Sequence, residues 1–223
     1  MKESIMVIAA HADDEALGCG GTMARLAAEG AQIQVVFMAD GVFSRESSTK
    51  NQQNQRKAAA NTVKKILGFK NMHFLDLPDN QMDQVPLLVI VQKLEALIRK
   101  YQPQTIFTHF YNDLNVDHRI TQQAVMTACR PLPGCPVKKI YGFETPSSTE
   151  WATPGESPFS PAFFMDISLF LKKKLNALQA YSMEMREPPH ARSLHNVEFL
   201  ARNRGHTMGI QAAEAFVVYR HIQ

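Results

Sequence analysis

The sequence predicts an α/β fold in which a mostly parallel sheet carries helices on both faces. Short apolar runs alternate with segments of helical spacing, which is typical of βαβ units. Most of the apolar runs end in polar residues, as buried strands do where they deliver side chains to a crevice. The 223 residues are 45% hydrophobic, enough for one sizeable core, so a single domain over residues 1–223 is expected.

The strands are predicted from apolar runs bounded by turn or polar residues. The first run, at residues 5–10, leads directly into His11. The pattern weakens after Glu144, where a stretch rich in Ser and Pro (145–161) predicts an ordered loop or flap. The predicted strands are residues 5–10, 33–38, 72–75, 105–108 and 140–143, then a short strand at 163–167 and a late one at 216–219.

The helices are predicted from apolar residues at helical spacing and from their stop signals. Gly30 and Gly68 end the first two helices, and Pro131 follows the fourth. The glycine cluster at residues 18–21 lowers helix propensity but permits close backbone packing. It lacks the G-x-G-x-x-G spacing of a dinucleotide site. The predicted helices are residues 16–29, 55–67, 85–101, 118–129, 168–185 and 192–202, and residues 44–54 are predicted to be a loop.

Composition excludes several function classes. A net charge of +3 is too small to indicate nucleic acid or an anionic membrane, and the cationic run at residues 172–174 is interpreted as a solvated helix face. No apolar run approaches the length of a membrane span or a signal peptide. Three scattered cysteines indicate free thiols in a reducing compartment. A cytoplasmic protein is therefore expected.

Right-handed crossovers place the ends of parallel strands on one edge of the sheet. The polar residues after the five predicted strands should therefore face a common crevice. They begin at His11, Asp40, Asp76, His109 and Glu144.

The segment His11-Ala12-Asp13-Asp14-Glu15 is too polar to bury without a partner of opposite charge. Two imidazoles and one carboxylate with an open position form a standard ligand set for catalytic zinc. His11 and Asp14 would supply the near pair and His118 the distant ligand. Asp13 is then a free carboxylate beside a water whose pKa zinc lowers to about 7, which predicts a general base.

These residues resemble the PIG-L/LmbE-like zinc N-deacetylases of bacteria, which remove acetyl groups from N-acetylglucosaminyl compounds. The resemblance rests on residues 11–15 and on Asp117-His118-Arg119, and extends to Arg56, Asp113 and the tail at 213–216. It implies a Rossmann-like sheet, His11, Asp14 and His118 as ligands of one Zn²⁺ per chain, and Asp13 as base. Other divalent metals are possible. The implied partner is a small N-acetylated sugar, and trimers or hexamers are frequent in such proteins.

Two positions depart from the family pattern. Ala12 replaces a usual proline, which removes some loop rigidity but no chemistry. Asn115 stands where many members have a histidine that polarises the scissile carbonyl. An amide can stabilise an oxyanion but cannot donate a proton as an acid. The general-acid role then falls to Asp13, His190 or His109.

Other polar residues are weaker candidates, each with a structural alternative. Asp117 is interpreted equally as the N-cap of its helix or as support for His118. Asp113 would orient a sugar hydroxyl or close a turn, and Trp151 would stack on a sugar or pack against protein. Asp79 is interpreted as a turn residue. The predicted substrate-binding residues are Arg56, Asp113, Asn115, Glu144, His190 and Arg192.

Two other functions compete with the deacetylase. A His/Asp/His triad also binds Fe(II) in oxygenases, although α/β alternation disfavours that class. A sugar- or nucleotide-binding module without turnover would account for the glycine cluster and the parallel sheet, but gives no reason for a free carboxylate beside a metal triad.

Overall fold

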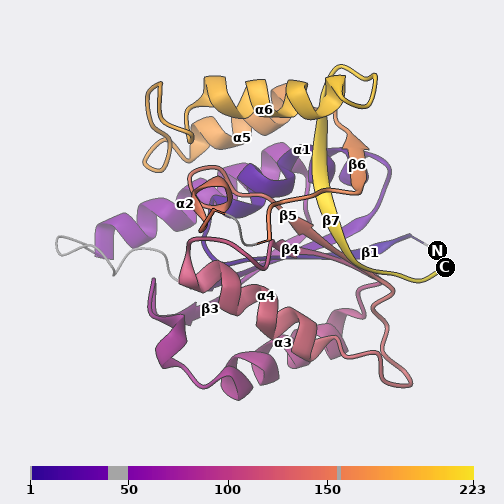
Figure 1. Cartoon of the computed structure of the whole chain (residues 1–223). Helices are drawn as coiled ribbons and strands as arrows, with labels where there is room; N and C mark the ends of the chain where they lie inside the picture. Colours follow the sequence, from indigo (N-terminus) through magenta and orange to yellow (C-terminus); the bar gives the residue numbers. More distant parts are fainter. Residues whose placement is uncertain (1, 40–49, 155–156) are drawn as a thin grey trace.

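The computed structural model describes residues 2–39, 50–154 and 157–223, and shows one α/β domain built on a seven-stranded sheet (Figure 1). The strand order is β3-β2-β1-β4-β5-β7-β6. The first five strands in this order are parallel, and β7 runs antiparallel to both β5 and β6. The predicted fold class, a mostly parallel sheet with helices on both faces, is confirmed.

The elements follow the predicted order with shifted ends. The strands are β1 (Ser4–Ala9), β2 (Gln32–Ala39), β3 (Asn71–Leu77), β4 (Thr105–His109), β5 (Lys139–Phe143), β6 (Phe163–Asp166) and β7 (Ala213–His221). The helices are α1 (Asp14–Ala28), α2 (Lys50–Leu67), α3 (Leu87–Tyr101), α4 (Val116–Ala128), α5 (Leu171–Ala180) and α6 (Leu194–His206), with short 3₁₀ turns η1 (Met82–Gln84) and η2 (Thr149–Trp151).

Two boundaries differ from the sequence prediction in a way that bears on the site. The helix predicted at 168–185 is shorter, because Asp166 accepts hydrogen bonds from the Ser168 backbone and hydroxyl and holds a turn before α5. The predicted loop at 44–54 is wrong from Lys50 onward, where α2 begins. The rest of that loop, and Asp40, lie outside the described residues.

The sheet separates two apolar layers, because β1 is buried on both faces. Ile5 and Val7 face a core shared with α1, α2, α5 and α6, while Met6 and Ile8 face a core shared with α3 and α4. Figure 1 shows these two groups of helices above and below the strands. Among the described helices, none has the length and apolar character required to cross a bilayer.

Helix α1 is kinked at Cys19, whose φ of −145° is not helical. A kink leaves backbone groups without helical partners. The Gly21 and Thr22 N–H groups donate to the Glu214 carboxylate at 3.0 and 2.7 Å. The Lys174 ammonium donates to the Leu17 carbonyl and to Glu214, both at 2.6 Å. A buried ion pair from α5 and β7 therefore completes the hydrogen bonding of α1.

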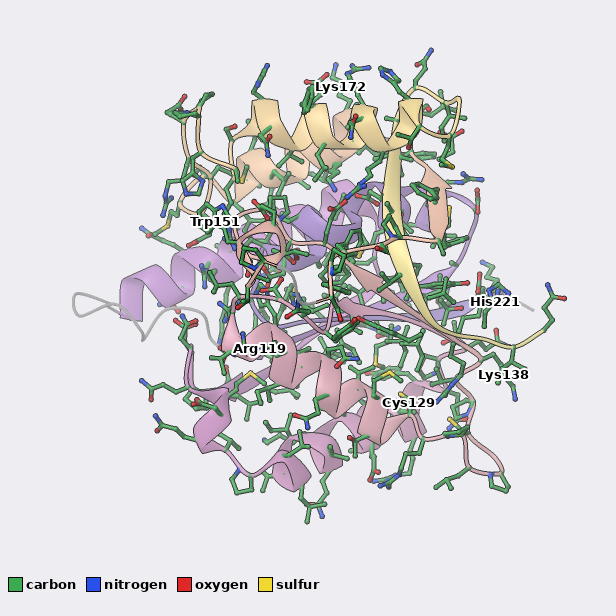
Figure 2. All side chains as sticks on the ribbon, in the orientation of Figure 1. Arg119, Cys129, Lys138, Trp151, Lys172 and His221 are labelled. Carbon is green, nitrogen blue, oxygen red and sulfur yellow. The ribbon has the colours of Figure 1, made fainter. Side chains whose placement is uncertain are left out.

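The Lys174–Glu214 pair corrects one prediction made from the sequence, and the contacts of the glycine cluster agree with another. Lys174 is 3% exposed and is not part of a solvated face, whereas Lys172 points to solvent (Figure 2). The glycine cluster does permit close packing, as expected. A Cβ at Gly18 would overlap the Phe143 ring, and one at Gly21 would lie 2.7 Å from Ile167. The first turns of α1 are thus fixed against β5 and the segment after β6.

Candidate metal centre

The polar residues gather at the point where the strand order reverses. β1 lies between β2 and β4, so the chain leaves these strands in opposite directions, and in open α/β sheets ligands bind beyond the carboxyl ends of the strands at such a point. The segment after β1 supplies residues 11–15, and the segment after β4 leads through Asp113 to His118 on α4. The segments after β1 and β4, which were expected to face a common crevice, therefore do lie together.

Three side chains form a candidate metal site. Ligand atoms of His11, Asp14 and His118 all lie within 4.8 Å of one another, and all three residues are buried. His11 Nδ1 and His118 Nε2 each lie 3.3 Å from Asp14 Oδ2. Asp14 Oδ1 and His118 Nε2 are buried, and neither has a hydrogen-bond partner among the residues that the structure describes. Buried unpartnered polar atoms are costly, and two imidazoles with a carboxylate suit a divalent metal, so this group fits one.

His118 is oriented by Asp113, the residue expected to bind a sugar hydroxyl or close a turn. His118 Nδ1 lies 3.0 Å from Asp113 Oδ1, and the Thr149 hydroxyl donates to Asp113 Oδ2 at 2.7 Å. The Ser148 hydroxyl also donates to Asp113. Burial would raise the pKa of Asp113, but the charge and hydrogen bond of His118 lower it to about 2. Asp113 therefore stays ionised and fixes the imidazole so that Nε2 faces Asp14.

His11 is oriented by Asp117, which was expected to cap its helix or to support His118. The Asp117 carboxylate lies 3.0 Å from His11 Nε2 and accepts hydrogen bonds from the Asn80 and Met82 backbone N–H groups. The N-cap of α4 is Asn115 instead. The N-cap interpretation of Asp117 is thus wrong, and the support expected for His118 goes to His11 instead, while Asp113 contacts His118.

Asp79 was missed. It lies in a turn, as predicted, but it is only 4% exposed, and its Oδ1 lies 3.1 Å from His11 Nε2. Its ligand atom also lies within 4.8 Å of those of His11 and Asp117. The signal was present in the sequence, because Asp79 stands in the exit loop of a predicted strand.

Asp13 lies beside the metal group in an unusual backbone conformation. Its φ of 147° is rare for a residue with a side chain and is typical of strained functional positions. Its N–H donates to Glu15 Oε2 at 3.0 Å, and its Oδ2 accepts from Arg192 Nη1 at 2.7 Å. Burial raises the pKa of Asp13 to about 6, against the opposing charge of Arg192. A carboxylate with such a pKa can both accept and return a proton near neutral pH.

A second layer of charges surrounds Asp13. Arg56 Nη2 lies 2.5 Å from Glu184 Oε1, and the Arg56 charge acts on Asp13. Glu15 accepts a hydrogen bond from the Tyr181 hydroxyl at 2.7 Å, and burial raises the pKa of Glu15 to about 8. Tyr181 and Glu184 follow α5, and no sequence pattern distinguished them from ordinary residues of a helix end.

His109 is fully buried and already bonded. Its Nε2 accepts the Ala10 N–H at 2.9 Å, its Nδ1 lies 3.3 Å from the Thr145 hydroxyl, and its ring stacks on His118 at 3.9 Å. Burial and the charge of His118 lower the pKa of His109 well below its usual value. A neutral imidazole with both nitrogens engaged does not serve as a general acid, which corrects that alternative.

The remaining candidates fall outside the metal group. Asn115 Oδ1 accepts the Asp117 N–H at 2.8 Å and its amide donates to Asn80 at 3.1 Å, so it acts within the loop. Glu144 forms a paired contact with Arg204 at 2.9 and 2.7 Å. His190 Nδ1 accepts the Arg192 N–H at 3.0 Å. Arg192 itself contacts Asp13 directly, at 2.7 Å.

A buried His/Asp/His group at the switch point of an α/β sheet, with a further carboxylate beside it, is typical of metal-dependent hydrolases. Comparison with known proteins supports this class. The PIG-L family, described as GlcNAc-PI de-N-acetylase, matches residues 6–129. The chain belongs to this family.

Individual relatives share most of the chain. The uncharacterized deacetylase YaiS of Escherichia coli is 31% identical over 81% of this chain and 91% of its own length. The 1D-myo-inositol 2-acetamido-2-deoxy-alpha-D-glucopyranoside deacetylase of Thermobifida fusca is 27% identical over 81% of this chain and 83% of its own. The crystal structure of the conserved protein TT1542 from Thermus thermophilus superposes with a TM-score of 0.79 at 25% identity, covering 100% of this chain and 97% of that one.

One relative has a different activity. The 4-oxalmesaconate hydratase of Pseudomonas putida is 26% identical over 80% of this chain and 72% of its own length. Relatives at this distance therefore include enzymes that add water as well as deacetylases.

Proposed function

We propose that the protein is a zinc-dependent hydrolase that removes the acetyl group from an N-acetylated amino sugar or its conjugate. The observation that carries this proposal is the buried His11/Asp14/His118 group, with the buried Asp13 next to Asp14 in the chain and the Arg192 guanidinium close to both carboxylates. Relatives named as deacetylases of N-acetylglucosaminyl compounds support the substrate class. Their conjugates differ, so the shared N-acetylated hexosamine is the part of the substrate that we assign.

His11, Asp14 and His118 would hold the metal, which when bound supplies Lewis acidity and a water of lowered pKa. Asp13 takes a proton from the attacking water as the bond to the carbonyl carbon forms. It then delivers this proton to the nitrogen as the C–N bond breaks, which yields acetate and a free amine. The Arg192 guanidinium donates hydrogen bonds to the Asp13 carboxylate and to the Ser147 hydroxyl, and so holds Asp13 in place. Asp113 and Asp117 keep the two imidazoles oriented.

Zinc is assigned from the donor set, since two imidazoles and a carboxylate suit it; Fe(II) uses the same donors in oxygenases. Iron dependence together with an oxygen requirement would favour that alternative. We place the enzyme in the cytoplasm, where the free thiols of Cys19, Cys129 and Cys135 are stable. A trimer or hexamer remains an expectation, which light scattering on the purified protein would test.

The decisive experiment couples a bound-metal assay to acetate release. The chain is incubated with free, nucleotide-linked and other conjugated N-acetylamino sugars, with and without chelator. Near-stoichiometric zinc and chelator-sensitive acetate release are expected. Asp13→Asn should keep its metal and lose at least about 100-fold in rate, because a positioned base contributes about 10²–10⁴-fold.

A matched control is Asp83→Asn, which changes an exposed aspartate on η1 and should leave the rate unchanged. A full rate in Asp13→Asn would refute the role of Asp13. Absence of both metal and acetate, with tight nucleotide or sugar binding, would favour a binding module.

The hydratase relative makes water addition to an unsaturated acid the second candidate. A bound metal and a carboxylate base serve that reaction as well. Incubation with 4-oxalmesaconate separates the two, because consumption of this acid without acetate release from any N-acetylated sugar would favour the hydratase.

A further inference from the structure

Trp151, the single tryptophan of the chain, is exposed beside the site. It ends η2, and 51% of its surface remains accessible (Figure 2). A large aromatic side chain normally contributes by burial. Its neighbours in the sequence, residues 147–150, are all polar, so this is one ring with a polar rim and not a broad apolar patch.

The turn that carries Trp151 is fixed to the metal group. The Thr149 hydroxyl accepts the Thr145 N–H at 2.8 Å and donates to Asp113 at 2.7 Å. Asp113 in turn holds His118 at 3.0 Å. Trp151 is therefore two residues from Thr149, which bonds the carboxylate that orients the candidate metal ligand His118.

His190 forms a second wall next to this indole. The two ring centroids lie 5.7 Å apart at an interplanar angle of 73°, so the rings form a corner. His190 Nδ1 accepts the Arg192 N–H at 3.0 Å, which leaves the ring hydrogen on Nε2 as a donor. Arg192 reaches Asp13 at 2.7 Å. The corner thus joins two segments that each hold a residue of the site.

We propose that Trp151 and His190 form a subsite for a second sugar ring, the pyranose attached to the N-acetylated unit. This inference rests on the proposed deacetylase function. The C–H face of a pyranose packs on the negative face of an indole, and a ring hydroxyl accepts a hydrogen bond from His190 Nε2. The acetylated ring itself must lie at Asp13, and the length of Arg192 separates Asp13 from the corner, because its backbone N–H donates to His190 while its guanidinium donates to Asp13. The corner therefore receives the neighbouring unit.

Tryptophan fluorescence reports on Trp151 alone, because the chain contains a single tryptophan. In the Asp13→Asn variant, which should not turn over, tryptophan emission is titrated with N-acetylglucosamine and with its β-1,4-linked disaccharide. A saturable change in emission is expected, with the disaccharide binding about tenfold more tightly than the monosaccharide, the size of one aromatic ring contact.

The same variant carrying Trp151→Ala is measured by calorimetry and should lose the tenfold preference. Phe199→Ala, which removes another exposed aromatic (62%) from α6, should keep it. An unchanged preference in Trp151→Ala overturns the subsite, as does absence of binding by either sugar. Acetate release by the unmutated chain is followed in parallel. Release without a Trp151 effect refutes the subsite alone, and a Trp151 effect without release refutes the reaction alone.

Discussion

The buried ion pair between Lys174 and Glu214 gives the sharpest test of how the site is supported. The perturbation is Lys174→Met, which keeps an unbranched side chain one atom shorter and removes its charge. Glu214 is then left buried, 3% exposed, without its cation, and the Leu17 carbonyl at the kink of α1 loses its donor. We expect a large loss of stability although neither residue touches the candidate metal ligands.

The expected decrease in Tm follows from one energetic cost and its conversion to temperature. Removing one partner of a buried ion pair costs about 3–5 kcal/mol, because the remaining charge is uncompensated. For a domain of this size, 1 kcal/mol lowers Tm by about 2–4 °C, so a decrease of about 6–20 °C is expected. The exposed neighbour Lys172→Met is the matched control and should stay within about 0.5 kcal/mol.

The double variant Lys174→Met with Glu214→Met distinguishes two explanations. An ordinary buried ion pair is often replaceable by apolar residues at little cost. Here the pair also bonds the Gly21 and Thr22 N–H groups and the Leu17 carbonyl, and each unpaired group costs about 1–3 kcal/mol. The double variant should therefore be no more stable than the single one.

The assay is urea unfolding followed by far-UV circular dichroism, with chelator in all samples so that bound metal does not add to the stability. Recovery of the unmutated midpoint in the double variant, at an unchanged m value, would refute the role that we assign to the kink.

Two further predictions concern the residues that support the candidate metal group and helix α1. Asp113→Asn should weaken metal binding about 10–100-fold, because His118 loses the carboxylate that orients it, and competition with a chelator of known affinity measures this; an unchanged affinity would contradict that role. Gly18→Ala should cost about 1–3 kcal/mol, because its Cβ would overlap the Phe143 ring, whereas Gly20→Ala meets its nearest neighbour at 3.6 Å and should fold normally in the same urea assay. Equal stabilities of the two glycine variants would show that the close contact at Gly18 is easily relieved.

The fold was predictable because local patterns agree with the tertiary structure. The alternation of apolar runs and helical segments, together with right-handed crossovers, predicted which strand ends meet. His11, Asp14 and His118 were expected to meet at these strand ends, and the structure places their ligand atoms within 4.8 Å of one another.

The partners of these residues were not predictable in the same way. Asp113 and Asp117 lie on one short segment, and only the direction of each side chain decides which imidazole it contacts. Lys174 follows two cations, and composition does not distinguish a buried member of such a run from the solvated ones. Both facts depend on packing between elements far apart in the sequence, with 39 residues separating Lys174 from Glu214 in the chain.

The charge balance around Asp13 shows why the last third of the chain matters to the site. The Asn115 side chain is hydrogen-bonded within the loop before α4. The described cations whose charges act on Asp13 are Arg56 and Arg192. Arg56 is held by Glu184, which follows α5, and Arg192 belongs to the segment before α6. The candidate ligands and the candidate base therefore lie in the segments that follow β1 and β4. Arg192, and the Glu184 that holds Arg56 of α2, come instead from the region where the alternating pattern fades. Substitutions between residues 181 and 193 should consequently alter the chemistry of Asp13 while leaving the metal ligands in place.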